Sequence, residues 1–456
     1  MNSPENSPAF AVRGISPVTA TAIVIANMVG TGIFTSLGFQ VGPLPSGFAI
    51  LVLWALGGIC AFCGALAYGE LAAAMPRSGG EYHFLSKSFH PSVGFVSGWL
   101  SATAGFAAPI ALAAMALGKY LTGVFPQVSA VVASLTVVWL VTLIHVGGIH
   151  VGARFQNVAT WMKVLLILIF IGAGFTVADP QPVSFLPAPG DWKLITSPPF
   201  AISLVFVMYA YAGWNAATYI VDEVRHPQRN VPLAIALGTL IVSGLYVALN
   251  AVFLHVAPMS ELAGKVDVAH AAADHIFGHT GGRIMSGLIC IGLVSSISAM
   301  TWVGPRVTMV LGQDHRILAP LAACDARGVP VAALFAQLSI VITLILTASF
   351  ERVLTYVQFS IQLCSFLTVY GLIRLRRTCP DLPRPVRCWG YPVTPVIFLL
   401  ISAWMMAYQL KEHTRESLAG LGTILVGLLL WRLSHQKGRG GEGQAGADGK
   451  AASLDA

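Results

Sequence analysis

Apolar runs of roughly 20 residues recur along the whole chain, separated by shorter polar connections. A run of this length is what an α-helix needs to cross the hydrocarbon core of a bilayer. About twelve such runs are present. They lie near residues 16–42, 47–75, 94–120, 128–148, 155–178, 198–221, 231–256, 284–310, 330–349, 353–373, 392–410 and 417–434. The pattern therefore predicts an all-α polytopic membrane protein with one transmembrane domain over residues 1–435.

Composition and charge agree with this class of protein. Of the 456 residues, 56% are hydrophobic and only 10% are charged, whereas about a quarter of a soluble domain is charged. The net charge of +7 then indicates basic loops at a membrane face, and no nucleic-acid partner is expected. The chain opens without a signal-peptide pattern. Residues 436–456 are polar and rich in glycine and alanine, which predicts a disordered cytoplasmic tail.

Lysine and arginine set the orientation. With the N-terminus in the cytoplasm, 18 of the 26 lie on the inner side or its flanks and 7 on the outer side. Because positive charge concentrates on the cytoplasmic side of membrane proteins, both termini are predicted to be cytoplasmic. None of the seven cysteines falls on the outer side under this placement, so we expect no structural disulfide.

The first apolar run is interrupted halfway by Gly30-Thr31-Gly32. Glycine inside a helix costs about 1 kcal/mol relative to alanine, and irregular backbone at membrane depth survives only where it lines a protected cavity. Such a break leaves amides free on one side and carbonyls on the other, which suits a ligand with an anionic and a cationic group. Close helix packing through small residues is the other interpretation.

The sixth run is interrupted in a similar way, within the stretch 201–223. Small residues crowd its middle, and Tyr209, Tyr211, Trp214 and Asn215 lie among them. Two interrupted helices at corresponding positions of two oppositely oriented halves indicate a transporter's midplane binding site. This pairing favours binding over simple packing for the first break.

Lys163 lies inside the fifth run, roughly 13 Å past Arg154 at 1.5 Å per residue. A lysine at that depth must face the protein interior. Three interpretations of Lys163 stay open: a proton-titrating switch, a permanent cation where other transporters bind sodium, or a structural strut between helices.

Several motifs together resemble the amino acid–polyamine–organocation superfamily, and most closely its L-type amino acid transporters and their bacterial relatives. They are VGTGIF, the YAGWN…DEVRHPQRNVP stretch from Tyr211 to Pro232, Lys163, and the stretch from Gly304 to Pro330. The resemblance implies a LeuT-like fold. It has five-plus-five inverted repeats, here about 16–178 and 198–373, and two C-terminal helices at about 392–434. The implied activity is exchange or facilitated transport of amino acids.

The resemblance also implies a binding site for the backbone of the amino acid. Its α-carboxylate would meet the amides and hydroxyl of the first break, and its α-ammonium would meet carbonyls of both breaks. The implied substrate-binding residues are Met28, Gly30, Thr31, Gly32, Ile33, Tyr209, Ala212 and Asn215. No acidic residue lies beside the breaks, which disfavours strongly cationic substrates.

Three side chains, Tyr209, Lys163 and Ser298, are implied to gate or couple the helices. Tyr209 would cover the substrate from outside. Lys163 would occupy a sodium-like position and brace the first and eighth spans, with Ser295, Ser298 and Thr301 as its nearest candidate partners. Glu70 and the acids at 222 and 223 are expected to pair with Arg77, Arg225 or Arg229 in an inner gate.

We therefore expect a sodium-independent transporter of neutral L-amino acids in a bacterial inner membrane, working by alternating access as an exchanger or uniporter. A proton-coupled symporter with Lys163 as the titrating group is the alternative, and a receptor that binds amino acids without moving them is another. The histidines form no catalytic or metal-binding cluster, so no enzyme, cofactor or metal is expected.

The expected partners are the lipid bilayer and the amino acid. Animal members of the family join a heavy chain through an extracellular cysteine after the third span. The corresponding loop here, Lys119–Gln127, has no cysteine. No disulfide-linked heavy chain is therefore expected, and the chain could act as a monomer.

Overall fold

The fold is a bundle of helices. The computed structural model describes the backbone of residues 15–147 and 153–451, with side chains in these ranges except at 153–157, 159 and 435–451. Over these residues all regular elements are helical, apart from one isolated bridge between Ile15 and Val224. In the described ranges, seven helices are long and apolar enough to cross a membrane, one bent pair is a further span, and four apolar helices are shorter. The predicted all-α polytopic class is confirmed.

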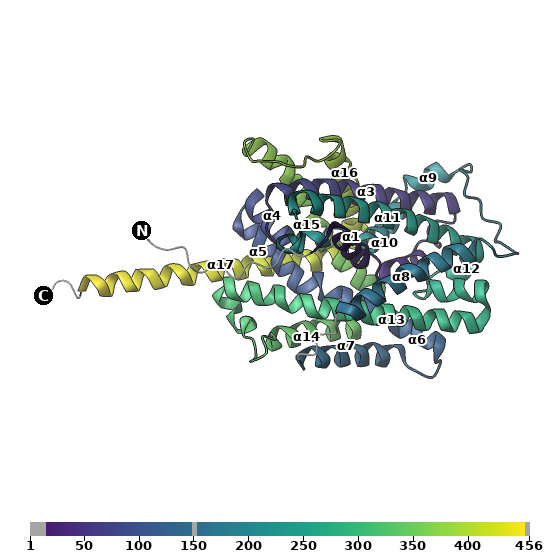
Figure 1. Cartoon of the computed structure of the whole chain (residues 1–456), viewed down its shortest axis with the longest axis horizontal. Coiled ribbons are helices and arrows are strands. Elements are labelled where there is room, and N and C mark those ends of the chain that lie inside the picture. Colours follow the sequence, from purple (N-terminus) through teal and green to yellow (C-terminus); the bar gives the residue numbers. More distant parts are fainter. Residues whose placement is uncertain (1–14, 148–152, 452–456) are drawn as a thin grey trace.

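The spans follow one another along the whole chain (Figure 1). They are α1 (Pro17–Met28) with α2 (Thr31–Thr35) and the 3-10 turn η1 (Ser36–Phe39), α3 (Gly47–Ala74), α5 (Pro91–Leu100) continued through the π-turn η2 (Ser101–Gly105) into α6 (Ala107–Val124), α7 (Ala130–Val146), α8 (Ala153–Gly174), α10 (Pro198–Tyr211), α11 (Pro227–Val256), α13 (Val268–Asp314), α14 (Val331–Thr347), α15 (Phe350–Thr378), α16 (Val393–Glu412) and α17 (Thr414–Ala451). Short connecting helices are α4 (Gly80–Ser88), α9 (Asp191–Ile195), η3 (Ala216–Tyr219), η4 (Val221–Glu223), α12 (Met259–Leu262) and η5 (Arg316–Ala322).

Most predicted spans agree with the helices to within a few residues, and two differ. The sixth was expected to continue to residue 221, but α10 ends at Tyr211, because Gly213 has a φ of +101° that a right-handed helix cannot contain. The eighth begins at Val268, well before the expected 284. Its first segment is polar and precedes a kink at Gly278, so hydropathy alone places it in a loop.

The C-terminal helix runs further than the apolar pattern. Its apolar, membrane-compatible part ends at Ser434, while the helix itself continues to Ala451. This continuation covers most of the stretch for which the sequence predicts a disordered tail. The described side chains end at Ser434, and the disordered tail and the two inverted repeats stay predictions.

Small residues let α3 lie close to α10, α11 and α16 in the middle of the bundle. A Cβ at Gly58 would lie 2.8 Å from the Ser243 hydroxyl of α11, and one at Gly69 would lie 3.2 Å from Pro232. Between helices in a membrane the hydrophobic effect contributes little, so close packing of this kind holds them together.

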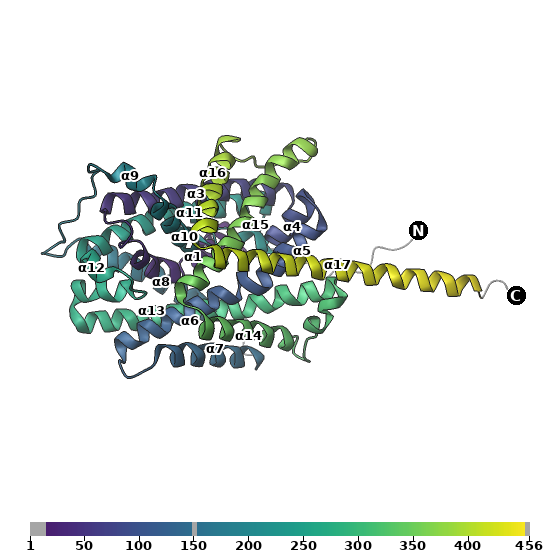
Figure 2. The ribbon, with the colours of Figure 1, turned by 180° about the vertical axis from the view of Figure 1, so that it is seen from behind.

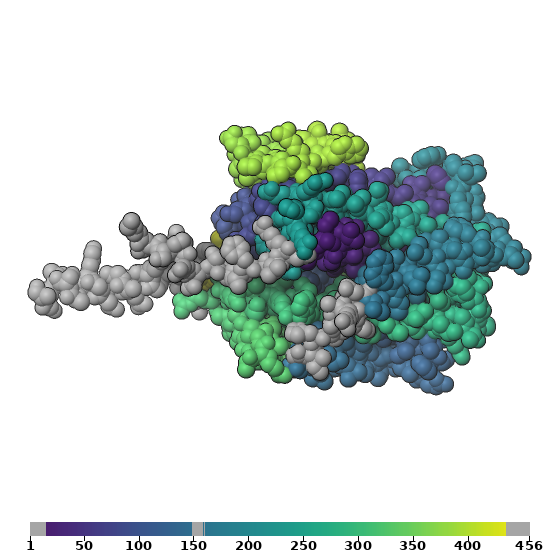
Figure 3. All heavy atoms as spheres, viewed as in Figure 1, coloured from purple at the N-terminus to yellow at the C-terminus, as the bar shows by residue number. Residues whose placement is uncertain are grey.

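The outer surface of the bundle is apolar, as a surface in contact with lipid requires. On α7 the exposed large side chains are Val131, Val132, Trp139, Leu140, Leu143 and Ile144. Figure 3 shows α1 (purple) reaching the surface on one side, between α11 (teal) and α8 (blue). Figure 2 shows α17 on the opposite side, where it packs against α5 and α15.

The bundle has two ends. The α1 face is the end where α1 begins and where the α10–α11 connection lies, since the Ile15 amide donates a hydrogen bond to the Glu223 carbonyl at 3.1 Å. The α12 face is the opposite end, where the Gly264 amide after α12 donates to the Gly38 carbonyl of η1 at 2.7 Å.

Candidate functional site

The first helix breaks where the sequence predicts. Helix α1 ends at Met28, and α2 begins at Thr31 after a bend of about 40°. Gly30 between them has φ and ψ of −122° and −148°, and its amide turns back to the Met28 carbonyl at 2.8 Å. The first amides of α2, from Thr31 onward, therefore start a new helix at the centre of the bundle, where such groups lack intrahelical acceptors.

The sixth span breaks in the same region. After Tyr211 the chain becomes extended at Ala212, with a ψ of 146°, and turns at Gly213 into the left-handed region. The Asn215 carbonyl then accepts hydrogen bonds from the amide and hydroxyl of Thr218, at 2.9 and 2.7 Å, and so starts η3. The backbone of Asn215 thus marks the end of the unwound segment, and a role of its side chain in binding stays a prediction.

The two breaks touch each other. A Cβ at Gly32 would lie only 2.5 Å from the Ala210 Cα, so α2 rests on the backbone of α10. On the other side, a Cβ at Gly213 would lie 2.8 Å from the carbonyl oxygen of Asn27 in α1. Glycine at 32 and 213 is therefore what lets the interrupted parts of the two helices meet.

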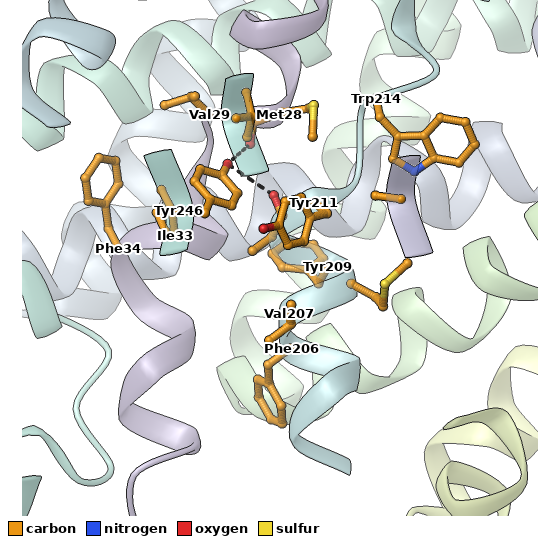
Figure 4. Packing of buried hydrophobic residues seen from close by; sticks show 14 of the residues in the cluster. Met28, Val29, Ile33, Phe34, Phe206, Val207, Tyr209, Tyr211, Trp214 and Tyr246 are labelled. Atoms are coloured by element: carbon orange, nitrogen blue, oxygen red, sulfur yellow. Dashed lines mark hydrogen bonds between the residues drawn. The ribbon is translucent and has the colours of Figure 1, made fainter. Parts of the chain in front are cut away.

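Tyr246 of α11 joins the ends of both helices, and the sequence analysis did not identify it. Its hydroxyl donates toward the Met28 carbonyl at 2.6 Å and lies 3.2 Å from the Ala210 carbonyl, as Figure 4 shows. Trp54 and Tyr211 pack around its ring. The available signal was one tyrosine within an apolar helix, because a buried phenol requires a hydrogen-bond partner.

Two of the predicted carbonyl acceptors, Met28 and Tyr209, accept hydrogen bonds in this structure. Met28 accepts from Tyr246 and from the Gly30 amide, and the Tyr209 carbonyl accepts from the Ala212 amide at 3.0 Å. The Tyr209 side chain is buried, and its hydroxyl interacts with Thr31. The Met28, Tyr209 and Ala210 carbonyls thus lie at the two breaks, and we refer to them as the polar cluster.

Lys163 is close to the first break. It is buried, and its Nζ donates to the Ser296 hydroxyl of α13 at 3.2 Å. A cavity of about 10 Å³ lies beside it, with room for about one water molecule. The lining residues are Gly30, Phe34, Lys163, Leu166, Leu288, Ile289, Gly292, Leu293 and Ser296. Lys163 thus lies between the first and eighth spans, and its role there stays a prediction.

The hydrogen-bond partner of Lys163 differs from the candidates that the sequence suggested. Ser296 follows Gly292 by one helical turn, and Gly292 packs directly on the lysine stem. Ser298 points elsewhere, with its hydroxyl 3.1 Å from Nε2 of His145 in α7. A shift of two residues rotates a side chain far around a helix, so a gating role for Ser298 stays a prediction.

The predicted ion pair of Glu70 with Arg77, Arg225 or Arg229, in an inner gate at the α1 face, is wrong. This fully buried carboxylate binds Arg376 through two hydrogen bonds and lies 3.3 Å from Nε of Arg384. It also accepts the Cys388 amide at 2.6 Å. These partners lie more than 300 residues away along the chain, and nearer arginines looked equally suitable in the sequence.

Backbone bonds close the α1 face. Besides the contact between Ile15 and Glu223, the Arg225 amide donates to the Ile15 carbonyl at 3.0 Å. The Asp222 carboxylate accepts the Ser78 amide at 3.0 Å, and the Ser78 hydroxyl accepts the Asp222 amide at 3.1 Å. The start of α1, the α3–α4 connection and the end of the sixth span are therefore held together.

Aromatic rings close the α12 face. Phe39 of η1 stacks on Phe206 of α10 and on Phe350 of α15, with centroids 5.0 and 5.8 Å apart. The Tyr120 hydroxyl of α6 donates to the Phe34 carbonyl at 2.8 Å. Tyr209, the expected outer lid, lies one turn deeper in α10 than Phe206. The polar cluster is therefore covered from both ends of the bundle.

Comparison with known proteins places the chain among transporters. A profile described as amino acid permease matches residues 15–429. The mouse b(0,+)-type amino acid transporter 1 is 26% identical over 432 residues, covering 92% of this chain and 88% of that protein. The mouse Asc-type amino acid transporter 1 is 25% identical, with coverage of 92% and 81%. The human large neutral amino acids transporter small subunit 2 is also 25% identical, with coverage of 92% and 80%.

Proposed function

Because this chain belongs to the amino acid permease family, we propose that it carries neutral L-amino acids across a membrane by alternating access, without sodium. The observation that carries the proposal is the contact between two interrupted helices, at Gly32 with Ala210 and at Gly213 with Asn27. A receptor needs a binding site but has no need of two interrupted spans held together at the middle of the bundle.

The amino-acid backbone fits the chemistry of the two breaks. The amides at the start of α2, around Gly30, Thr31, Gly32 and Ile33, are suited to the α-carboxylate. The carbonyls of Met28, Tyr209 and Ala212 are suited to the α-ammonium, because unwound carbonyls attract cations. In the resting arrangement one of these carbonyls accepts the Tyr246 hydroxyl, which the ammonium would join or replace.

The side chain of the substrate is neutral in this proposal. Neither break contains an acidic residue, since residues 27–33 and 209–216 have no aspartate or glutamate. A cationic side chain would then lie at membrane depth without a counterion, which is costly. The name of one relative, the large neutral amino acids transporter small subunit 2, points in the same direction.

Lys163 supplies the positive charge that makes sodium unnecessary. It lies beside Gly30, at the point where the first break faces α13. A cation covalently attached there can stabilise the break in place of a bound metal ion. If Lys163 released its proton during the cycle instead, the protein would be a proton symporter, and the transport experiment below separates the two.

The α1 face is cytoplasmic in this proposal, and the membrane is the bacterial inner membrane. Arginine is concentrated at the α1 face, where Arg376, Arg377, Arg384 and Arg387 lie at and after the end of α15. Positive charge is retained on the cytoplasmic side. We also propose that no heavy chain is attached by a disulfide, because the connection between α6 and α7 has no cysteine.

Counterflow in proteoliposomes tests the function. Purified protein is reconstituted with unlabelled amino acids inside, and entry of labelled alanine, serine, leucine and arginine is followed without sodium. The proposal predicts that the labelled neutral amino acids enter preloaded vesicles, at a rate that does not change when sodium is added. Entry into empty vesicles only under an acid-outside gradient would identify a proton symporter. No entry of any label, from folded protein, would contradict amino-acid transport.

A further inference from the structure

A buried carboxyl group lies near the α1 face, in the short helix α4. The Glu81 side chain belongs to a residue that is only 6% exposed. Its Oε1 accepts hydrogen bonds from the Tyr68 hydroxyl of α3 and from the Ser365 hydroxyl of α15, the latter at 2.9 Å. Three helices that are separate in sequence therefore converge on this one carboxyl oxygen.

The described surroundings of Glu81 contain no compensating charge. In the part of the chain that the structure describes, no lysine, arginine or histidine forms an ion pair with it. The titratable groups that face it are Tyr68, Tyr219 of η3 and Cys364 of α15, all neutral in their ordinary state. This distinguishes Glu81 from Glu70, which is equally buried but lies between two arginines.

A lone carboxylate in such a place is unfavourable. Burial of an ionised group without a counterion costs far more than burial of the neutral acid, so the group binds a proton instead. Burial accordingly raises the pKa of Glu81 above its ordinary value, and the hydrogen bonds from Tyr68 and Ser365 offset part of that increase. The neutral acid also keeps a donor and an acceptor for its neighbours.

One side chain, that of Tyr68, lies between Glu81 and the second helix break. Tyr68 packs edge-on against Trp214 in the unwound segment, with centroids 4.6 Å apart. The backbone next to Glu81 also touches the sixth span, because a Cβ at Gly80 would lie 2.6 Å from the Tyr219 ring. The Tyr219 hydroxyl interacts in turn with Asn215. A change of charge at Glu81 therefore acts directly on the inner half of the sixth span.

We propose that Glu81 is a proton-binding site that holds the α1 face closed. The carboxyl group is protonated in the closed arrangement seen here and releases its proton when the face opens and water reaches it. The inference rests on the proposed function in one respect, since opening of the α1 face is a step of alternating access.

The direction of the pH effect follows from linkage. The closed face has the raised pKa and the open, hydrated face has a pKa near the ordinary carboxyl value. Between these two pKa values the closed state binds more protons than the open state, so the closed state loses stability as pH rises through that interval. Below the ordinary carboxyl pKa the carboxyl group is protonated in both states, and the stabilisation of the closed state by Glu81 is at its maximum.

Infrared difference spectroscopy of the purified protein tests the proton site without any transport. The carbonyl stretch of a protonated carboxylic acid is followed from about pH 5 to 9. We expect a band that persists well above the ordinary carboxyl pKa of about 4.3 and is missing in Glu81→Gln, whose amide imitates the neutral acid. The control Glu261→Gln retains the band, because Glu261 pairs with His275 and Lys265 at the α12 face, and the bond from His275 lowers its pKa.

A second variant distinguishes a titrating group from a merely structural one. Ser365→Ala removes a donor that stabilises the ionised form, so the midpoint of the band moves upward by ~0.5–1 pH unit. A purely structural contact would leave the midpoint unchanged. A wild-type band that titrates at the ordinary carboxyl pKa, or a band that survives Glu81→Gln, overturns the proton site whether or not the protein exchanges amino acids.

The gating part is tested by exchange at equal pH on both sides of the membrane. Wild-type exchange should rise with pH along the same titration as the infrared band, because deprotonation favours opening. In Glu81→Gln the exchange rate should stay, over the whole pH range, at the low value that the wild type shows at acid pH. Wild-type pH dependence that is retained in Glu81→Gln would contradict the assignment of the gate to this residue.

Discussion

Glycine at position 32 is required by the neighbouring helix and not by its own backbone angles. Gly32 lies inside α2, where any residue could be helical. Its missing side chain matters because the Ala210 Cα would lie 2.5 Å from a Cβ, and backbone atoms cannot move aside as a flexible side chain can. Gly30, two residues earlier, is different: among the described residues beyond its chain neighbours, the nearest atom to a Cβ built there is the Met28 carbonyl oxygen at 3.9 Å.

The difference between the two glycines gives a matched pair of variants. Gly32→Ala should separate α2 from α10 and lower the exchange rate about tenfold or more, since overpacking costs about 1–3 kcal/mol. Gly30→Ala should retain exchange within about twofold. Counterflow of both variants at equal reconstituted amounts is the measurement. Wild-type exchange by Gly32→Ala would show that the contact between the breaks is not needed.

The partner of Lys163 illustrates what the sequence can indicate at this scale. Depth in the membrane was enough to predict that Lys163 is buried between helices. The choice among serines at 295, 296 and 298 depended on how α13 is rotated about its axis. Small residues lie all around this part of α13, so the periodicity of the sequence does not show which side of the helix faces Lys163. The hydrogen bond to Ser296 became visible only with the packed structure.

At the scale of elements, most of the fold could be predicted because hydropathy reports span length directly. The departures have local causes. Helix α10 stops early at the positive φ of Gly213, and α13 starts early because its polar first segment lies outside the apolar pattern. The ion pairs of Glu70 could not be predicted, because the sequence does not reveal which distant loop folds back against α3.

Helix α11 holds the broken ends together through one hydroxyl. Tyr246→Phe should remove this donor from the Met28 and Ala210 carbonyls. Met28 retains the hydrogen bond from the Gly30 amide, whereas Ala210 loses the Tyr246 hydroxyl, and an unsatisfied buried carbonyl costs about 1–3 kcal/mol. We expect the Tm of the substrate-free protein to fall by about 2–5 °C. The rise in Tm on adding a transported amino acid should be larger than in the wild type, because the substrate ammonium can satisfy the same carbonyls.

Tyr211→Phe is the control for that experiment. It also removes a buried hydroxyl, which donates to the Trp54 carbonyl at 3.1 Å, but it leaves the hydrogen bonds of the two broken ends intact. Its Tm should fall without a larger response to substrate. Equal substrate responses in Tyr246→Phe, Tyr211→Phe and the wild type would contradict the link between Tyr246 and the binding carbonyls.

At the scale of the whole molecule, the polar cluster is closed toward both ends of the bundle. Backbone bonds between Ile15, Glu223 and Arg225 close the α1 face, and the stack of Phe39, Phe206 and Phe350 closes the α12 face. Alternating access requires that one closure opens while the other holds. The two closures differ in chemistry, since one is polar and the other aromatic, so conditions such as pH can act on one alone.

The central claim is that the two breaks bind the charged backbone of an amino acid, with amides for the carboxylate and carbonyls for the ammonium. Competition against labelled amino acid in the counterflow assay tests it most directly. The competitors are the free amino acid, its methyl ester, which lacks the anion, and its N-acetyl derivative, which lacks the cation. We predict that only the free amino acid competes. Equal competition by either derivative would contradict recognition of both charges by the paired breaks.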